Sequence, residues 1–461
     1  MRFRTGLYIG AAFLAGIAAQ PTTGWTLRHL GVAHADDATD AKTANKYHLL
    51  ELFGNVFEQV RDDYVAPVDD QTAIENAIEG MVGGLDPHSA YMNAKAWADM
   101  QIQTQGQFGG LGLEVTQEGG ILKVISPIDD TPAARAGIKS GDYITALDNL
   151  SVEGLTLDKA VSMMRGTPGT QIKLTIKRQG IDTPVVAILT REVINIQVVK
   201  SALYNDVGYI RLSMFNEQTD SGLHDALAKL QAQEAAKGGH LKSLILDLRN
   251  NPGGLLDQAV AVSNDFISQG EIVSTHGRHP EDDHRWNASP SGNISNGLPL
   301  VVLINNGSAS ASEIVAGALQ DHRRAVVMGE QSFGKGSVQT VIQLGNNDGA
   351  LRLTTARYYT PSGRSIQGLG ITPDIPVRFS AKDEASFSPA HETDLEGIIQ
   401  NQGGTPNGDA VPKRDDLPAI AKSIPAAPPA NFPAYDPTKP EATDFQLQQG
   451  LVVARTMESK P

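Results

Sequence analysis

The spacing of hydrophobic residues divides the chain into three zones. Between Leu49 and Val82, apolar residues recur every three or four positions, which predicts amphipathic helices. From Gly106 to Glu192, short alternating runs separated by glycine-rich turns predict a domain made of strands. Beyond Ile194, strand and helix patterns alternate, which is typical of an α/β core whose strands are buried on both faces.

Individual elements of the third zone can be placed from the same pattern. The expected strands are residues 207–213, 243–248, 300–304, 325–328 and 351–359, and the expected helices are residues 219–235, 254–267 and one beginning over 312–319. Residues 379–440, rich in Pro, Ala, Asp and Lys, are expected to form a mobile linker. A last helix over residues 445–457 could dock on its own domain or on a partner subunit.

The first 35 residues differ from the rest of the chain. Arg2 and Arg4 precede an uncharged run over residues 6–19, and an A-x-A sequence ends at Ala35. That order predicts an export signal that is cleaved after Ala35. An uncleaved membrane anchor is the competing interpretation, although the apolar run is short for a bilayer. In either case we expect most of the chain outside the cytoplasm, in the periplasm or cell envelope.

The composition and charge of the chain argue against some binding partners and exclude some kinds of catalytic and metal-binding site. The length of 461 residues suggests several domains, and 40% hydrophobic and 20% charged residues are ordinary for a soluble globular protein. The formal charge of −14 opposes binding to the phosphates of nucleic acids. The sequence contains no cysteine, which excludes disulfides, cysteine nucleophiles and thiolate metal sites.

The stretch GEQSFGKGSVQ, residues 329–339, nearly spells a nucleotide-binding phosphate loop. That motif needs a hydroxyl directly after the lysine to bind magnesium, but Gly336 follows Lys335. A phosphate loop must also lead into a helix, whereas the residues after Ser337 alternate like a strand. The sequence therefore disfavours nucleotide binding, and Lys335 needs another role.

A turn rich in small residues, 306–314, stands between an expected buried strand and an expected helix. A serine at such a turn is exposed, and the helix N-terminus beside it favours an anion. Acyl transfer needs this combination of a nucleophile and donors for the oxyanion, which makes Ser310 a candidate nucleophile. A turn that only caps the helix would have a similar sequence, since serine is a favoured N-cap.

A serine nucleophile also needs a base. His322 follows Ser310 by twelve residues, but two neighbouring arginines would oppose its protonation. Lysine can replace histidine if burial lowers its pKa from about 10.4 toward 7 or 8. Lys335 lies between two glycines with no acid within three residues. If it lies on a strand, Gln339 shares its face and could orient it.

Residues 105–192 resemble a PDZ domain of the bacterial type. The resemblance is carried by Ala136-Gly137-Ile138 and Gly141-Asp142-Tyr143-Ile144, which follow a glycine-rich turn. PDZ domains bind an extended peptide as an added strand and hold its C-terminal carboxylate in the glycine loop. The resemblance implies that the tail peptide contacts Gly110, Leu111, Gly112 and Leu113.

The chain as a whole resembles the C-terminal processing peptidases, also called tail-specific proteases, over about residues 45–378. The motifs that carry the resemblance, besides the PDZ segment, are Gly84-Leu85-Asp86-Pro87-His88-Ser89, Asp247-Leu248-Arg249-Asn250-Asn251-Pro252-Gly253-Gly254, Gly307-Ser308-Ala309-Ser310-Ala311-Ser312-Glu313-Ile314, Phe333-Gly334-Lys335-Gly336-Ser337-Val338-Gln339 and Thr354-Thr355-Ala356-Arg357-Tyr358-Tyr359-Thr360-Pro361-Ser362-Gly363.

The family resemblance implies a role for each matching residue. It maps the nucleophile to Ser310, the base to Lys335 and a supporting residue to Gln339. The oxyanion donors would be the amides of Gly254 and Ala311. Arg165 stands where the family's PDZ domain faces the core, so it could relay substrate binding to the active site or be a solvated surface arginine. His88, at a turn, is more readily explained by structural hydrogen bonds than by catalysis.

The domain layout that follows is an α/β protease core of mixed sheet and helices, crotonase/Clp-like, with an inserted PDZ domain and a helical N-terminal cap. The expected segments are 1–35 for the export signal, 40–104 for the cap, 105–192 for the PDZ domain, 193–378 for the core, 379–440 for the linker and 441–461 for a C-terminal helix.

The expected function is an exported serine endopeptidase that recognises protein C-terminal tails and requires no metal or nucleotide cofactor. A resting protease activated by a partner and a non-catalytic PDZ scaffold are the alternatives. We expect protein substrates with free C-terminal tails as partners, no nucleic acid, an activating adaptor if the enzyme rests, and a homodimer through the apolar faces of the terminal helices.

Overall fold

A computed structural model describes residues 36–380, 391–401 and 414–457, so the expected export signal lies outside the described residues. The chain divides into two units between Ile74 and Glu75, and the described part of the first unit begins at Asp36. The first unit holds helix α1 (Asp36–Asp63), in which Leu50 and Phe53 are 57% and 48% exposed. Within the described ranges, no helix is both long enough and apolar enough to cross a membrane.

The core of the second unit is a six-stranded sheet in the order β10-β11-β12-β15-β16-β19. Strand β10 (Val199–Tyr204) is antiparallel to β11 (Val207–Leu212), and the others, β12 (Ser243–Asp247), β15 (Leu300–Ile304), β16 (Val326–Gly329) and β19 (Ile375–Pro376), run parallel to β11. Every residue of β12, β15 and β16 is buried, which requires a layer on each face.

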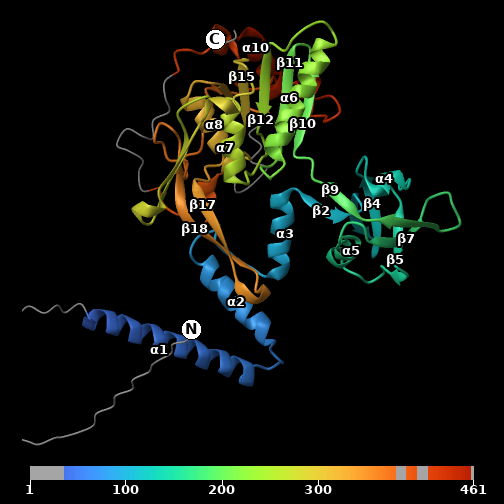
Figure 1. The fold of residues 1–461 in the computed structure, drawn as a ribbon, viewed down its shortest axis with the longest axis vertical. Coiled ribbons are helices and arrows are strands. Elements are labelled where there is room, and N and C mark those ends of the chain that lie inside the picture. Colours follow the sequence, from blue (N-terminus) through green and yellow to red (C-terminus); the bar gives the residue numbers. More distant parts are fainter. Residues whose placement is uncertain (1–35, 381–390, 402–413, 458–461) are drawn as a thin grey trace, which may run out of the picture. The chain divides into compact units, whose positions relative to one another are not determined.

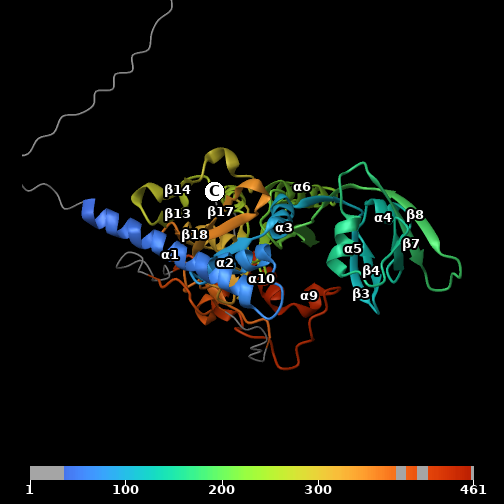
Figure 2. The same cartoon turned by 90° about the horizontal axis from the view of Figure 1, so that it is seen from below.

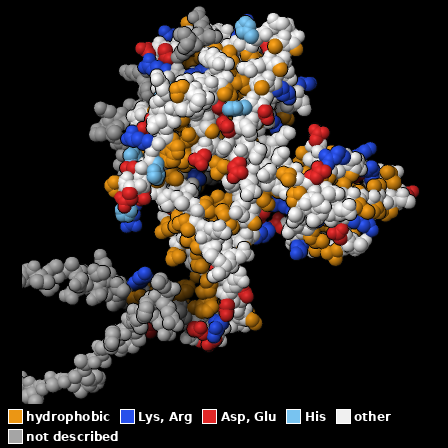
Figure 3. Space-filling view, viewed as in Figure 1, with side chains coloured by type: hydrophobic (Ala, Val, Ile, Leu, Met, Phe, Trp, Pro, Cys, Tyr) orange, Lys and Arg blue, Asp and Glu red, His pale blue; other side chains and the backbone are white. Residues whose placement is uncertain are grey.

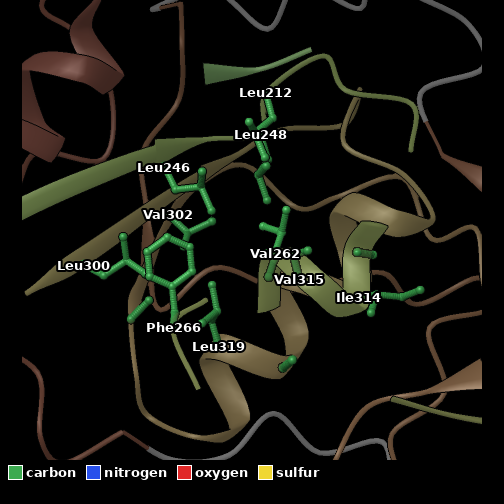
Figure 4. Close-up of a cluster of buried hydrophobic side chains, with 14 of the residues drawn as sticks. Leu212, Leu246, Leu248, Val262, Phe266, Leu300, Val302, Ile314, Val315 and Leu319 are labelled. Carbon is green, nitrogen blue, oxygen red and sulfur yellow. The ribbon is translucent and has the colours of Figure 1, made fainter. Parts of the chain in front are cut away.

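Helices α6 (Thr219–Ala235), α7 (Leu256–Asn264) and α8 (Ala311–Asp321) cover one face of this sheet (Figure 1). Because side chains alternate along a strand, Leu300 and Val302 point to this face and pack with Phe266 (Figure 4). The intervening Val301 and Leu303 face the other side, where they pack against helix α10 (Phe445–Thr456). The last helix thus docks on the sheet of its own chain.

A second, antiparallel sheet joins the core to the segment that precedes the β-rich domain. Strands β17 (Ser337–Gln343) and β18 (Ala350–Tyr359) form a hairpin, drawn in orange in Figure 1, that pairs with β13 (Glu271–Gly277), and β13 pairs with β14 (His284–Asn287). Strand β1 (Ala90–Met92) pairs with β18 between helices α2 (Asp70–Gly83) and α3 (Ala94–Gln105). We expected the segment 40–104 to be helical throughout. It also contains this short strand, which forms one edge of the sheet. Figure 3 shows hydrophobic side chains gathered over β17 and β18.

The β-rich domain has its own core. Its six-stranded sheet consists of β3 (Leu113–Glu118), β4 (Ile121–Pro127), β5 (Tyr143–Leu147), β6 (Leu150–Ser151), β7 (Gln171–Lys177) and β8 (Val185–Thr190). Helices α4 (Pro132–Arg135) and α5 (Leu157–Met164) lie beside the sheet (Figure 2). Strands β2 (Gln107–Gly110) and β9 (Glu192–Asn195) pair where the chain enters and leaves, as an inserted domain requires. The α/β core and the inserted β-rich domain confirm the predicted fold class.

The prediction that residues 379–440 form a mobile linker is wrong for the parts of this segment that the structure describes. Glu392, in a short helical turn (Glu392–Asp394), is fully buried, and Arg414 forms an ion pair with Asp374 at 3.0 Å. A second turn (Ala419–Ser423) contributes Ile420 to the apolar cluster under α10. The average composition of the segment is polar and proline-rich, but a few of its apolar and charged residues pack against the core and hold it there.

Candidate active site

Ser310 lies at the junction of β15 and α8 in a strained backbone conformation. Its φ of 54° and ψ of −113° are rare for a residue with a side chain, and strain of this kind is often retained at reactive sites. The hydroxyls of Ser308 and Ser312 donate to backbone carbonyls of Leu248 and Asn251 at 2.8 and 2.9 Å. Among the described residues, no backbone carbonyl accepts the Ser310 hydroxyl in this way, so its proton remains available to a base.

Lys335 lies in the loop between β16 and β17. Burial lowers the pKa of Lys335, and the positive charge of Arg352 lowers it further against the opposing pull of Glu392 and Glu313. Its ammonium forms no ion pair with a carboxylate in the ranges that the structure describes. The loop joins two strands rather than a strand and a helix, which confirms that it is not a phosphate loop.

Glu313 connects these two residues. Its fully buried carboxylate accepts the Ser310 and Lys335 amides on one oxygen, at 2.7 and 2.9 Å. The other oxygen accepts the Ser332 hydroxyl at 2.6 Å and the Gly334 amide at 2.7 Å. Since both amides reach one oxygen atom, the backbones of Ser310 and Lys335 lie within about two hydrogen-bond lengths of each other.

The turn after β12 packs against the Ser310 turn. The Asn251 carbonyl accepts the Ala309 amide at 3.0 Å as well as the Ser312 hydroxyl, so it holds the residues on both sides of Ser310. A Cβ added at Gly253 would lie 2.8 Å from the Ser310 Cβ and 3.0 Å from the Ala311 nitrogen, so only glycine allows this approach. The amides of Gly254 and Ala311 donate to no other described residue, as oxyanion donors must.

Gln339 is not placed as the strand pattern predicted. Strand β17 begins at Ser337, so Lys335 lies before the strand, and a bulge between Val338 and Gln339 shifts the register. The Gln339 amide donates to the hydroxyls of Ser337 at 2.9 Å and Thr354 at 3.3 Å. Within the described residues it makes no hydrogen bond to Lys335, so the expectation that both share one strand face was wrong.

Both histidines considered from the sequence have structural partners. His322 Nε2 is hydrogen-bonded to the Glu271 carbonyl at 2.7 Å. His88 Nε2 lies 2.8 Å from the carboxylate of Glu392. Glu392 also accepts the amide of Gln367, whose own oxygen accepts the Gly336 amide at 3.0 Å beside Lys335. Sequence reasoning missed Glu313, Gln367 and Glu392; only Glu313, three residues after Ser310 at the start of a helix, had a local signal.

The residues predicted to bind a peptide lie in the β-rich domain. Gly110, Leu111, Gly112 and Leu113 form the turn from β2 into β3, and Gly112 has a φ of +75° that favours glycine. Arg165, after α5, donates to Asp99 of α3 at 3.1 Å and lies over the Phe108 ring. Arg165 therefore contacts the helix that leads into the domain, rather than being a solvated surface residue.

Three family models match the chain. One described as peptidase family S41 matches residues 206–377, one described as a PDZ domain matches residues 109–187, and one described as an activating protease CtpB N-terminal domain matches residues 10–96.

Curated relatives match most of the chain. A carboxy-terminal-processing protease of Bartonella bacilliformis is 50% identical over 394 residues, which cover 84% of this chain and 90% of the relative. The carboxy-terminal processing protease CtpA of Bacillus subtilis is 35% identical over 328 residues, 70% of this chain and 68% of the relative. Among solved structures, a photosystem II D1 C-terminal processing protease is 30% identical, with a TM-score of 0.41 over 70% of this chain and 85% of that one.

Proposed function

Because the chain belongs to the carboxy-terminal-processing proteases of peptidase family S41, we propose that Ser310 is its nucleophile and Lys335 its general base. The observation that carries this proposal is the bridge by Glu313, which brings the backbones of these two residues to one carboxylate. The pKa of Lys335, lowered mainly by burial, supports the role of a base.

The proposed reaction proceeds through an acyl-enzyme. Neutral Lys335 takes the proton of the Ser310 hydroxyl as the oxygen attacks the carbonyl carbon of the scissile peptide bond. The amides of Gly254 and Ala311 donate to the oxyanion that forms. Lysine then gives its proton to the leaving amine, and the ester left on Ser310 is hydrolysed by a water that Lys335 deprotonates.

Substrate recognition is assigned to the PDZ domain. Its turn over residues 110–113 would hold the carboxylate of a protein's C-terminal tail, and the tail would add a strand to the domain's sheet. The contact of Arg165 with Asp99 offers a route from this domain to α3. We propose that residues 1–35 direct the protein to the cell envelope, and that the exposed apolar side chains of α1 support a homodimer.

A resting enzyme is a second candidate for the state of this site. The observation in its favour is that Gln339 bonds Ser337 and Thr354 rather than Lys335. Binding of a tail peptide or an adaptor would then bring Gln339 to the lysine. Activity that appears only after a tail peptide or partner is added would distinguish this state from a constitutively active one.

The experiment that tests the proposed function is cleavage of an unstructured protein with a free apolar C-terminal tail. The mature chain and its Ser310→Ala variant are compared, and mass spectrometry of the products locates the cut. We expect cleavage by the wild type alone, and loss of cleavage when the substrate's terminal carboxylate is amidated. Cleavage by the Ser310→Ala variant at the wild-type rate would refute the assignment.

A further inference from the structure

A cluster of three potential metal ligands lies between α6 and α7, on residues that the proposed reaction does not use. Asp220 and His224 stand four residues apart on α6, so they share one face of the helix. Asp265 directly follows the last residue of α7. One donor atom from each of the three side chains lies within 4.8 Å of the other two.

One carboxylate oxygen of the buried member of the cluster lacks a hydrogen-bond partner. Asp265 is 3% exposed, and its Oδ1 lies 2.7 Å from His224 Nε2. Its Oδ2 is buried and has no hydrogen-bond partner among the described residues. A buried carboxylate oxygen without a partner is costly, so an ion pair with His224 alone does not account for the arrangement.

The charge of the cluster is negative. Asp220 lies 3.7 Å from His224 Nε2, so a single imidazole serves two carboxylates, and Asp225 adds a further negative charge near it. A divalent cation would neutralise both carboxylates and provide a partner for the buried oxygens.

The ligand types indicate which cation fits. One imidazole nitrogen and two carboxylate oxygens suit zinc, whereas calcium and magnesium prefer oxygen ligands alone. Metal–ligand distances of about 2.1 Å place tetrahedral ligands roughly 3.4 Å apart. The present separations of 2.7 and 3.7 Å lie on either side of that value, and His224 and Asp220, 45% and 34% exposed, leave room to adjust and a path from solvent.

We propose that Asp220, His224 and Asp265 bind a structural zinc ion that fastens α6 to the end of α7. A hydrogen bond also joins the two helices beside the cluster, where the Gln258 side chain accepts the Asp220 amide at 2.9 Å. Helix α7 begins two residues after Gly254, a proposed oxyanion donor. A zinc ion bound at the other end of α7 would therefore fix the position of the helix that follows this donor. A water would complete the coordination as the fourth ligand.

Zinc titration of the untagged chain, after chelator treatment and dialysis, tests this proposal. Isothermal titration calorimetry and the thermal unfolding midpoint are measured with zinc chloride, and with magnesium and calcium chloride for comparison. We expect one zinc per chain and an upward shift of the midpoint that magnesium and calcium do not produce, because ligand that binds only the folded state stabilises it.

Two variants locate the site. His224→Gln removes an exposed side chain, and Asp265→Asn removes the buried charge; both are expected to fold and to lose the zinc-dependent shift. The matched control is His240→Gln, which removes an exposed histidine outside the cluster and should retain the shift. Absence of zinc binding by the wild type, or an unchanged shift in the His224 variant, would overturn the proposal. Equal shifts with calcium would overturn the choice of ligand chemistry.

Discussion

Replacement of Glu313 by glutamine tests whether this residue positions the catalytic pair. All four groups that approach the carboxylate act as donors in this structure: three backbone amides and the Ser332 hydroxyl. The glutamine NH₂ group therefore faces at least one backbone N–H. The less costly orientation places the NH₂ group beside Ser332, whose hydroxyl oxygen can accept a hydrogen bond from it. In that orientation only the Gly334 amide loses its acceptor.

The magnitude follows from that single unpaired donor. A buried N–H without a partner costs about 1–3 kcal/mol, which the loop carrying Lys335 can relieve by moving. If movement of this loop costs the transition state the same 1–3 kcal/mol, kcat/KM falls roughly 5- to 150-fold, at about 1.4 kcal/mol for each factor of ten. The negative charge of Glu313 also raises the pKa of Lys335, so the variant's acid limb should move to lower pH.

The Glu313→Gln substitution should lower activity without lowering stability at pH 8. Burial raises the pKa of Glu313 from 4.5 to about 7, so this group's contribution to stability is fully present below pH 4.5 and is lost as pH rises through about 7. Glutamine resembles the protonated carboxyl and lacks this loss. At pH 8 the variant avoids the penalty of charging a buried carboxyl, roughly 3 kcal/mol for a pKa raised from 4.5 to about 7, which offsets the cost of the unpaired Gly334 amide, so its unfolding free energy should be no lower than that of the wild type.

The assay is kcat/KM for a tail-bearing substrate between pH 6 and 10, with urea unfolding at pH 8. The matched control is Glu234→Gln, the same substitution at a buried glutamate of α6 outside the site. Wild-type kcat/KM together with an unmoved acid limb in Glu313→Gln would refute the positioning role. A loss of activity that only parallels a loss of stability would refute it as well.

Three further predictions concern the base, the facing turn and the C-terminal helix. Because burial lowers the pKa of Lys335, the acid limb of kcat/KM should have its midpoint below the ordinary lysine value of about 10.4, and Lys335→Arg, always charged, should show no activity at any pH. Gly253→Ala should reduce kcat/KM because the new Cβ lies 2.8 Å from the Ser310 Cβ, whereas Gly238→Ala, at a similar positive φ but with open space around it, should leave kcat/KM unchanged. Arg249→Met leaves the carboxylates of Asp247 and Asp444 buried without their shared partner, and should lower the unfolding free energy by about 3–5 kcal/mol in urea titration; an unchanged midpoint would contradict the importance of this contact between α10 and the sheet.

The fold of the core was predictable because its elements have strong periodic patterns. The helix at residues 219–235 and the strand at residues 300–304 lie where the pattern placed them. Short elements without a pattern were missed: β1 has three residues, and its place in a sheet depends on pairing with β18, far along the chain. Composition alone could not show that Glu392 and Arg414 anchor a polar segment.

The candidate site was predictable as far as local motifs reach. Ser310 and Lys335 stand in small-residue turns whose neighbours suggested their roles, and the structure brings the two turns together. The bridge by Glu313 could not be inferred, since it depends on a contact between residues 22 positions apart. The partners of Gln339 depended on where β17 begins and on a bulge, which periodicity does not specify.

The most direct test of the Ser310–Lys335 mechanism is substrate cleavage by the Lys335→Ala variant. The variant and the wild type are incubated with the same tail-bearing protein, products are identified by mass spectrometry, and circular dichroism checks that the variant is folded. The mechanism predicts a folded variant that binds the tail peptide and makes no cut. Cleavage by the folded variant at the wild-type rate would contradict it.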